Sequence, residues 1–206
     1  MIQIVDVPPT VSLDESEAHA TLARPVQDLR AEARQLVPAL AGRRVWMVSS
    51  TARGGGVAEM MPRLVTVLRE LGVPTEWAVI GSDEPRFFPL TKRLHNMIHG
   101  IAETPPDAAD REVYEAVSRA NAAELGPRLA PGDVLVVHDP QPMGVGALLV
   151  REQGVPAIWR CHIGLDDENA ATRAAWAFLA PYTGAYAHAV FSAPEYVTGF
   201  PAHRAA

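Results

Sequence analysis

Polar side chains that could hold a ligand follow three separate apolar runs of the sequence. One run leads into the triple-glycine loop 54–56, the next ends in His138 and Asp139, and a third contains Arg160 and His162. If these runs are parallel strands, their carboxyl ends meet at one edge of an open sheet, where such folds bind their ligands. We therefore expect the three segments to form one site.

The triple-glycine loop stands at the start of an amphipathic segment. Glycine permits positive backbone dihedral angles and a helix N-terminus attracts anionic oxygens, so the loop suits a phosphate; a tight flexible turn is the alternative interpretation. The loop lacks both the G-x-G-x-x-G spacing of dinucleotide sites and the Lys-Ser/Thr pair of NTP-binding loops, which argues against those uses. Glu59, in the first turn after it, is either a carboxylate favoured by the helix dipole or a group that fixes the loop or a sugar hydroxyl.

The polar residues of the second and third runs have structural and functional interpretations. His138 and Asp139 could be a core histidine beside a capping carboxylate, but their place at the end of a strand favours ligand contact. Arg160 and His162 flank Cys161 in an alternating segment, so both should point to one face and the thiol to the other. We interpret Cys161 as a core residue, because no neighbouring group in the sequence would activate it as a nucleophile.

We expect neither a metal nor another cofactor. His95 and His99 are four residues apart on an expected helix, which is a spacing that metal ligands use. No carboxylate motif of the H-E-x-x-H kind accompanies them, so we interpret both as surface or packing histidines.

Strands and helices are expected to alternate along the chain. Hydrophobic periodicity predicts strands over 45–48, 75–80, 134–139, 157–163 and 185–191, and helices over 57–71, 91–99, 110–125, 143–153 and 168–179. This order predicts an α/β fold with a Rossmann-like, mostly parallel sheet and helices on both faces.

The first part of the chain, residues 1–44, is expected to pack a strand and a helix on the core of the Rossmann-like domain 45–206. A short apolar stretch precedes a pair of prolines, and apolar residues then recur at intervals of three and four from Leu22 to Leu40. That period predicts a helix with one stripe on the core.

Composition restricts the class of protein. The chain has 206 residues, 48% of them hydrophobic, and a formal net charge of −6. The negative charge argues against a nucleic acid or an anionic membrane surface as partner, because both require a cationic face. One cysteine cannot form an intramolecular disulfide, and the N-terminus has no basic and apolar leader pattern, so the expected location is cytoplasmic.

Four motifs in order carry a resemblance to a known family. They are SSTARGGGVAEMMPRLVTVLRELGV, TKRLHN, VVHDPQPMG and WRCHI. With them the chain, over about residues 30–197, resembles the N-terminal half of retaining GT-B glycosyltransferases of family 4, in the trehalose synthase and trehalose phosphorylase group. The resemblance implies transfer of a glucosyl unit from a nucleotide-glucose or glucose 1-phosphate to glucose. It also implies that the N-terminal domain holds the acceptor and a C-terminal domain holds the donor nucleotide.

The resemblance also implies roles for individual residues. The loop that closes over the donor phosphate and sugar corresponds to Gly54, Gly55, Gly56 and Val57, with Glu59 in the following helix. The catalytic residues would be His162, Arg160 and Asp139, and the other substrate-binding residues Asn96, His138 and Gln141.

Two departures from the family leave alternatives open. Gly164 replaces a carboxylate in the CHIG segment, and the chain stops where the family's donor domain would begin, so we expect that domain to be absent. The chain would then be the acceptor half of a truncated or split transferase. Alternatively, it is a standalone sugar-binding or accessory protein, possibly a homodimer, that kept the fold and lost transfer; a repurposed small enzyme is a third interpretation.

Overall fold

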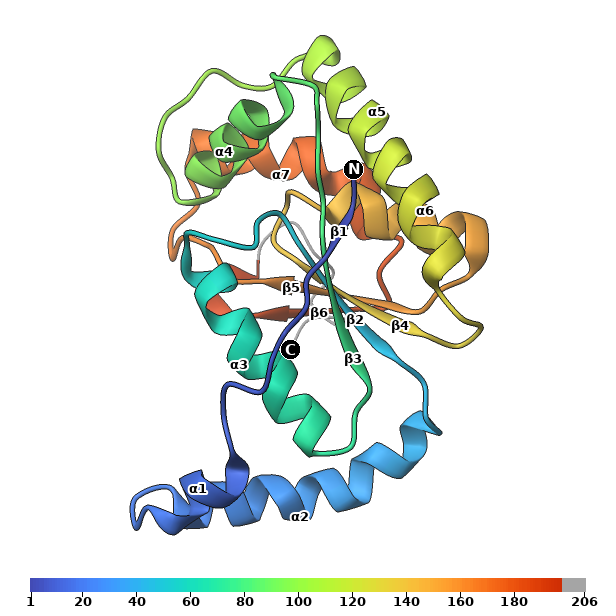
Figure 1. Cartoon of the computed structure of the whole chain (residues 1–206). Coiled ribbons are helices and arrows are strands. Elements are labelled where there is room, and N and C mark those ends of the chain that lie inside the picture. Colours follow the sequence, from blue (N-terminus) through green and yellow to red (C-terminus); the bar gives the residue numbers. More distant parts are fainter. Residues whose placement is uncertain (198–206) are drawn as a thin grey trace.

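Six strands form one sheet within residues 1–197, the part of the chain that the computed structural model describes. Their order is β1-β3-β2-β4-β5-β6 (Figure 1). The strands are β1 (Gln3–Ile4), β2 (Val45–Ser49), β3 (Thr75–Val79), β4 (Val134–His138), β5 (Ala157–Cys161) and β6 (His188–Phe191). All neighbours run parallel except β1, which pairs antiparallel with β3.

Helices lie on both sides of this sheet. They are α1 (Leu13–Ala18), α2 (Ala23–Leu40), α3 (Gly56–Glu70), α4 (Phe87–Ile98), α5 (Ala108–Leu125), α6 (Met143–Gln153) and α7 (Ala170–Thr183), with single 3₁₀ turns at Gly126–Arg128 and Pro194–Tyr196. In Figure 1, α3 lies on one side of the sheet and α4 to α7 lie on the other. This arrangement confirms the predicted Rossmann-like α/β fold.

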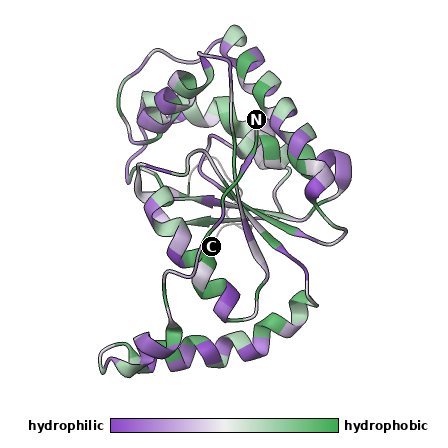
Figure 2. Cartoon of the chain, in the orientation of Figure 1, coloured by the Kyte–Doolittle hydropathy of each residue, from purple (hydrophilic) through white to green (hydrophobic). Residues whose placement is uncertain are grey.

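Alternation along the strands divides the core in two. On β2, Trp46 and Val48 face the larger hydrophobic cluster, beneath α4 to α7, while Val45 and Met47 face the smaller one, beneath α3. This is the period of two expected for a strand that is buried on both faces. Figure 2 shows the resulting concentration of hydrophobic residues in the strands and on the inner helix surfaces.

The N-terminal helix is present as α2, but the prediction that its apolar stripe rests on the core is largely wrong. Val26 is 7% exposed, whereas Leu22, Leu29 and Leu36 are 45%, 37% and 60% exposed. The helix packs against the short helix α1, which the periodicity did not indicate, and it contacts the smaller cluster through Val37 and Leu40, near its C-terminus. A six-residue helix is too short to cover the whole stripe.

Two classes of feature are missing from the described residues. None of the helices within residues 1–197 is long and apolar enough to cross a membrane. The same residues contain no group of three or more histidine, cysteine, aspartate or glutamate side chains placed to hold a metal ion.

Candidate functional site

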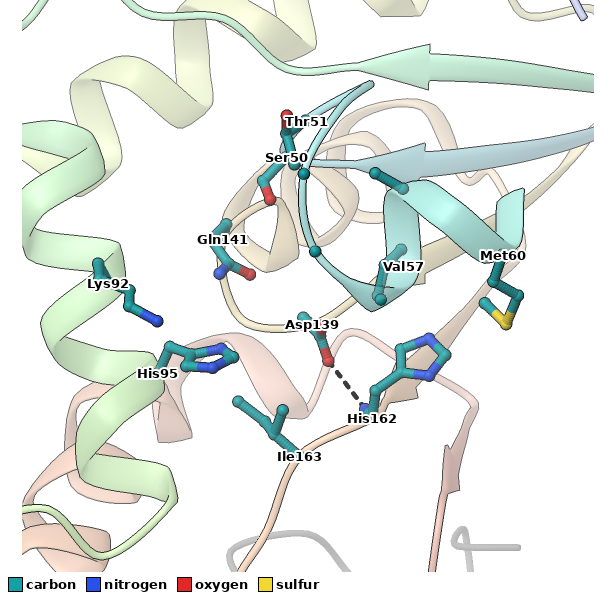
Figure 3. Close-up of a pocket in the computed structure, with 14 residues that line it drawn as sticks. Ser50, Thr51, Val57, Met60, Lys92, His95, Asp139, Gln141, His162 and Ile163 are labelled. Atoms are coloured by element: carbon teal, nitrogen blue, oxygen red, sulfur yellow. Dashed lines mark hydrogen bonds between the residues drawn. The ribbon is translucent and has the colours of Figure 1, made fainter. Parts of the chain in front are cut away.

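The three expected segments meet in one cavity at the carboxyl ends of β2, β4 and β5. Its volume is about 340 Å³. The lining residues are Ser50, Thr51, Gly54, Gly55, Gly56, Val57, Ala58 and Met60 after β2, Lys92 and His95 on α4, Asp139 and Gln141 after β4, and His162 and Ile163 after β5. Figure 3 shows α3 with its glycine loop on one side of the cavity and α4 on the opposite side.

The glycine loop enters α3 through a backbone conformation that side chains do not tolerate. Gly54 has φ +73°, and Gly55, the N-cap, has φ 96° and ψ 155°, a region populated almost only by glycine. Thr51 closes the preceding turn, because its Oγ1 donates to the carbonyl of Arg53 at 2.7 Å and accepts from the amide of Arg53 at 3.2 Å. Among the described residues, no side chain caps α3, so the amides of its first turn remain available to an anionic ligand.

Asp139 is a buried carboxylate in a strained backbone position. It has φ 64° and is 8% exposed. Its Oδ1 accepts a hydrogen bond from the His162 amide at 2.8 Å, and its carbonyl accepts one from Trp159 Nε1 at 3.0 Å. Burial raises the pKa of Asp139 to about 6, against the opposing influence of the His162 amide and the Arg160 charge. Strain that the surrounding contacts maintain is typical of functional sites.

A buried tyrosine holds the loop that carries Asp139 and Gln141. The Tyr114 hydroxyl donates to the carbonyl of Pro140 at 2.7 Å and accepts from the amide of Gly144 at 2.9 Å. Gln141 lies between these two anchors, and its Oε1 is buried without a hydrogen-bond partner among the described residues. The two anchors therefore fix the segment that brings Gln141 to the cavity.

The two histidines of the second and third runs differ in their access to the cavity. His162 lines it, and burial together with the Arg160 charge lowers the pKa of His162 to about 4, so the ring is neutral near pH 7. His138, in contrast, is 2% exposed and lies behind His162, with its Nδ1 2.9 Å from His162 Nε2. The structure therefore places His138 in the support of the site and outside its lining.

Arg160 also lies outside the lining. Its guanidinium donates to the carbonyl of Cys161 at 2.7 Å, to the carbonyl of Val190 at 3.1 Å and to Ser192 Oγ at 3.1 Å. These contacts tie the end of β5 to β6. Arg160 therefore affects the site through its position and charge, since it also lowers the pKa of His162.

Three further residues singled out in the sequence lie away from the cavity lining. Glu59 is exposed and outside the lining. Asn96 donates through Nδ2 to Glu103 Oε1 at 3.0 Å and lines a separate surface hollow. Cys161 is the expected core residue, because it is fully buried, its thiol donates to the carbonyl of Ile163, and burial raises its pKa.

Sequence reasoning missed Lys92 and His95, which form the α4 side of the cavity. Burial, followed by the nearby Lys92 and His99, lowers the pKa of His95 to about 4. The TKRLHN motif indicates that Lys92 and His95 lie together, because they are three positions apart and so share a helix face. In that motif the resemblance implies a role for Asn96 alone.

Tyr196 occupies the space that a side chain at position 164 would need. A Cβ placed on Gly164 would lie 2.1 Å from Tyr196 Cγ. A side chain at position 164 would therefore clash with this aromatic ring.

Comparison with known proteins gives one family. Residues 47–198 match the family described as "Trehalose synthase, N-terminal domain". The trehalose synthase of Rubrobacter xylanophilus is 38% identical over 176 residues, covering 82% of this chain and 40% of that protein. The trehalose synthase of Pyrococcus horikoshii is 37% identical over 158 residues, covering 77% of this chain and 36% of that protein. The trehalose phosphorylase of Pleurotus sajor-caju is 36% identical over 144 residues, covering 65% of this chain and 18% of that protein. The chain spans less than half the length of each of these relatives.

Proposed function

Because this chain belongs to the trehalose synthase N-terminal domain family, we propose that its cavity binds glucose as the acceptor of a glucosyl transfer. The observation that carries the proposal is Asp139. A buried carboxylate in a strained backbone position, beside a neutral imidazole, is an arrangement for accepting hydrogen bonds from hydroxyl groups.

The remaining lining suits a polyhydroxyl ligand. Asp139 supplies acceptors, Lys92 is a donor, and Gln141 adds an amide to the lining. These groups come from α4 and from loops at the ends of strands, which hold them in fixed positions around the cavity. Rigid polar groups of both kinds are what recognition of a sugar requires.

The glycine loop suits the donor side of the same reaction. Its uncapped amides and the Lys92 ammonium would stabilise the phosphate of a nucleotide-glucose or of glucose 1-phosphate. In this proposal the chain supplies the acceptor half of a GT-B cleft, and a second domain, on the same or another polypeptide, holds the nucleotide. His162 would contact the transferred sugar, with Asp139 orienting the acceptor hydroxyl.

Titration calorimetry with glucose tests the acceptor site directly. We expect wild-type protein to bind glucose and Asp139→Asn, which keeps the backbone conformation and removes the charge, to bind at least fivefold more weakly, because a hydrogen bond to a charged group contributes about 1 kcal/mol more than one to a neutral group. Asp167→Asn, at an exposed position outside the cavity, is the matched control and should bind as wild type does. Equal affinity in the wild type and Asp139→Asn would refute the acceptor site.

A standalone sugar-binding protein is the second candidate, and one observation favours it. The described residues form a cavity of about 340 Å³ whose lining includes a carboxylate, an amide and an ammonium group, which are groups that bind sugar hydroxyls. Trehalose formation from ADP-, UDP- or GDP-glucose plus glucose, measured with and without a donor-domain partner, separates the two functions. Turnover in the presence of the partner supports the transferase, whereas glucose binding without turnover in any mixture supports the binding protein.

A further inference from the structure

Three side chains form a row that leads from the core to the cavity. Met47 lies on β2 and is 4% exposed, His138 ends β4 and is 2% exposed, and His162 lines the cavity. His138 Nε2 is 3.4 Å from Met47 Sδ, and His138 Nδ1 is 2.9 Å from His162 Nε2. The centroids of the two imidazole rings are 5.2 Å apart and their planes differ by 11°, so with these nitrogens in contact the rings lie edge to edge, as a hydrogen bond in the ring plane requires.

The chemistry of the sulfur sets the direction of both hydrogen bonds. A thioether carries no hydrogen and can only accept, so the proton of His138 lies on Nε2. Burial, followed by the proximity of the His162 ring and the Arg160 guanidinium, lowers the pKa of His138 to about 3, which keeps its ring neutral and leaves Nδ1 as an acceptor. The bond between the rings is then donated by His162 Nε2. Since His162 is also neutral, its Nδ1 carries no proton.

We propose that Met47 and His138 are positioning residues that fix the tautomer of His162, so that its Nδ1 accepts a hydrogen bond from a ligand hydroxyl in the cavity. The reverse tautomer would set the His138 Nε2 lone pair against the sulfur and would make His162 Nδ1 a donor. The identity of the ligand rests on the proposed sugar site, but the tautomer itself does not.

The choice of tautomer matters for a sugar hydroxyl that is to react. A hydroxyl that donates to Nδ1 keeps its oxygen lone pairs free, and the bond raises the electron density on that oxygen. A hydroxyl that accepted from a protonated Nδ1 would have a lone pair occupied. Among the described residues Nδ1 has no hydrogen-bond partner, so it is available for this contact.

Two-bond ¹H–¹⁵N correlation spectra of the ligand-free protein at pH 7 test the tautomers, because they distinguish protonated from unprotonated ring nitrogens. We expect both His138 and His162 to be protonated on Nε2. In Met47→Leu, which keeps the bulk and removes the acceptor, we expect a mixture of tautomers at both rings. Met61→Leu, a buried methionine in the same cluster, is the matched control and should give the wild-type spectrum.

Protonation of Nδ1 on either ring in the wild type would overturn the proposal. An unchanged spectrum in Met47→Leu would overturn the part assigned to the sulfur. These outcomes are independent of the proposed function, since they are recorded without ligand. Absence of glucose binding by a wild type with the expected tautomers would count against the proposed function alone.

Affinity measurements extend the test to the ligand. His138→Asn retains a side-chain carbonyl that can accept from His162 Nε2, whereas His138→Leu retains none. We expect glucose binding to weaken about fivefold in His138→Leu and in Met47→Leu, and by less than about twofold in His138→Asn. Equal losses in the leucine and asparagine variants of His138 would indicate a purely structural role and would contradict the proposal.

Discussion

Asp139 has three unusual properties: a left-handed backbone conformation, a buried side chain and a raised pKa. Each property has a cause in its contacts. The backbone is held by the bonds of its carbonyl to Trp159 and of its amide to Arg160, and the carboxylate is held by the His162 amide. Asparagine and aspartate tolerate this backbone region best, so an asparagine can replace Asp139 without new strain.

The raised pKa of Asp139 predicts how stability changes with pH. The folded protein binds this proton up to about pH 6, whereas the unfolded chain releases it near 3.8, so the contribution is present below pH 3.8 and is lost as the pH rises through about 6. Wild type should therefore lose about 3 kcal/mol of unfolding free energy relative to Asp139→Asn between pH 3.5 and 7.

Urea unfolding of both proteins across this range measures the difference. His138 and His162 act in the opposite sense, because their lowered pKa values make stability fall as the pH drops below about 6.5. Both proteins share these histidines, so their effect cancels in the comparison. Parallel stability curves for wild type and Asp139→Asn would contradict the prediction.

At the scale of elements, the start of α3 depends on the conformation of Gly55 more than on that of Gly56. Gly55→Ala should cost about 1 to 3 kcal/mol and weaken phosphate binding, since its backbone lies in a region almost restricted to glycine. Gly56→Ala is the matched control: Gly56 begins the helix, and a Cβ there would meet no atom within 4 Å. Chemical denaturation gives the stability, and titration with glucose 1-phosphate gives the affinity. Equal effects of the two substitutions would show that backbone conformation is not the cause.

Most elements of the fold could be predicted from the sequence because their signals are local. The run 143–153 predicts α6 to the residue, and continuous apolar runs predict β2, β4 and β5. Helix α4 begins at Phe87, four residues before the predicted start at 91, and includes Pro89 in its first turn, where proline is tolerated. Helix α1 has only six residues, which is too short for a periodic signal.

The site was less predictable, because its lining depends on contacts between distant elements. Strand ends predicted that Asp139, His162 and the glycine loop would lie together, and all three line the cavity, as does Gln141, which the resemblance added; their roles stay predictions. Whether the side chain of His138 faces ligand or core depends on the packing of its strand beside Met47, which the sequence does not specify. The contribution of α4 likewise follows from its packing on α5 and α7.

On the scale of the whole molecule, α2 is the element least integrated into the fold (Figure 1). Leu36→Glu should change the unfolding free energy by less than about 0.5 kcal/mol, because this side chain is 60% exposed. Val26→Ala should cost about 1 to 2 kcal/mol, since Val26 is 7% exposed. Urea denaturation of both variants checks the contrast. A large loss in Leu36→Glu would instead indicate that the exposed leucines are covered in solution.

The cavity has one further consequence for the molecule. Its lining spans positions 50 to 163, so the ligand-binding surface exists only when the chain is folded. A compound that binds there and not to the unfolded chain adds RT ln(1 + [L]/Kd) to the unfolding free energy, about 2.7 kcal/mol at a hundred times Kd. Thermal melting can therefore rank sugars, sugar phosphates and sugar nucleotides by affinity, without turnover and without a donor domain.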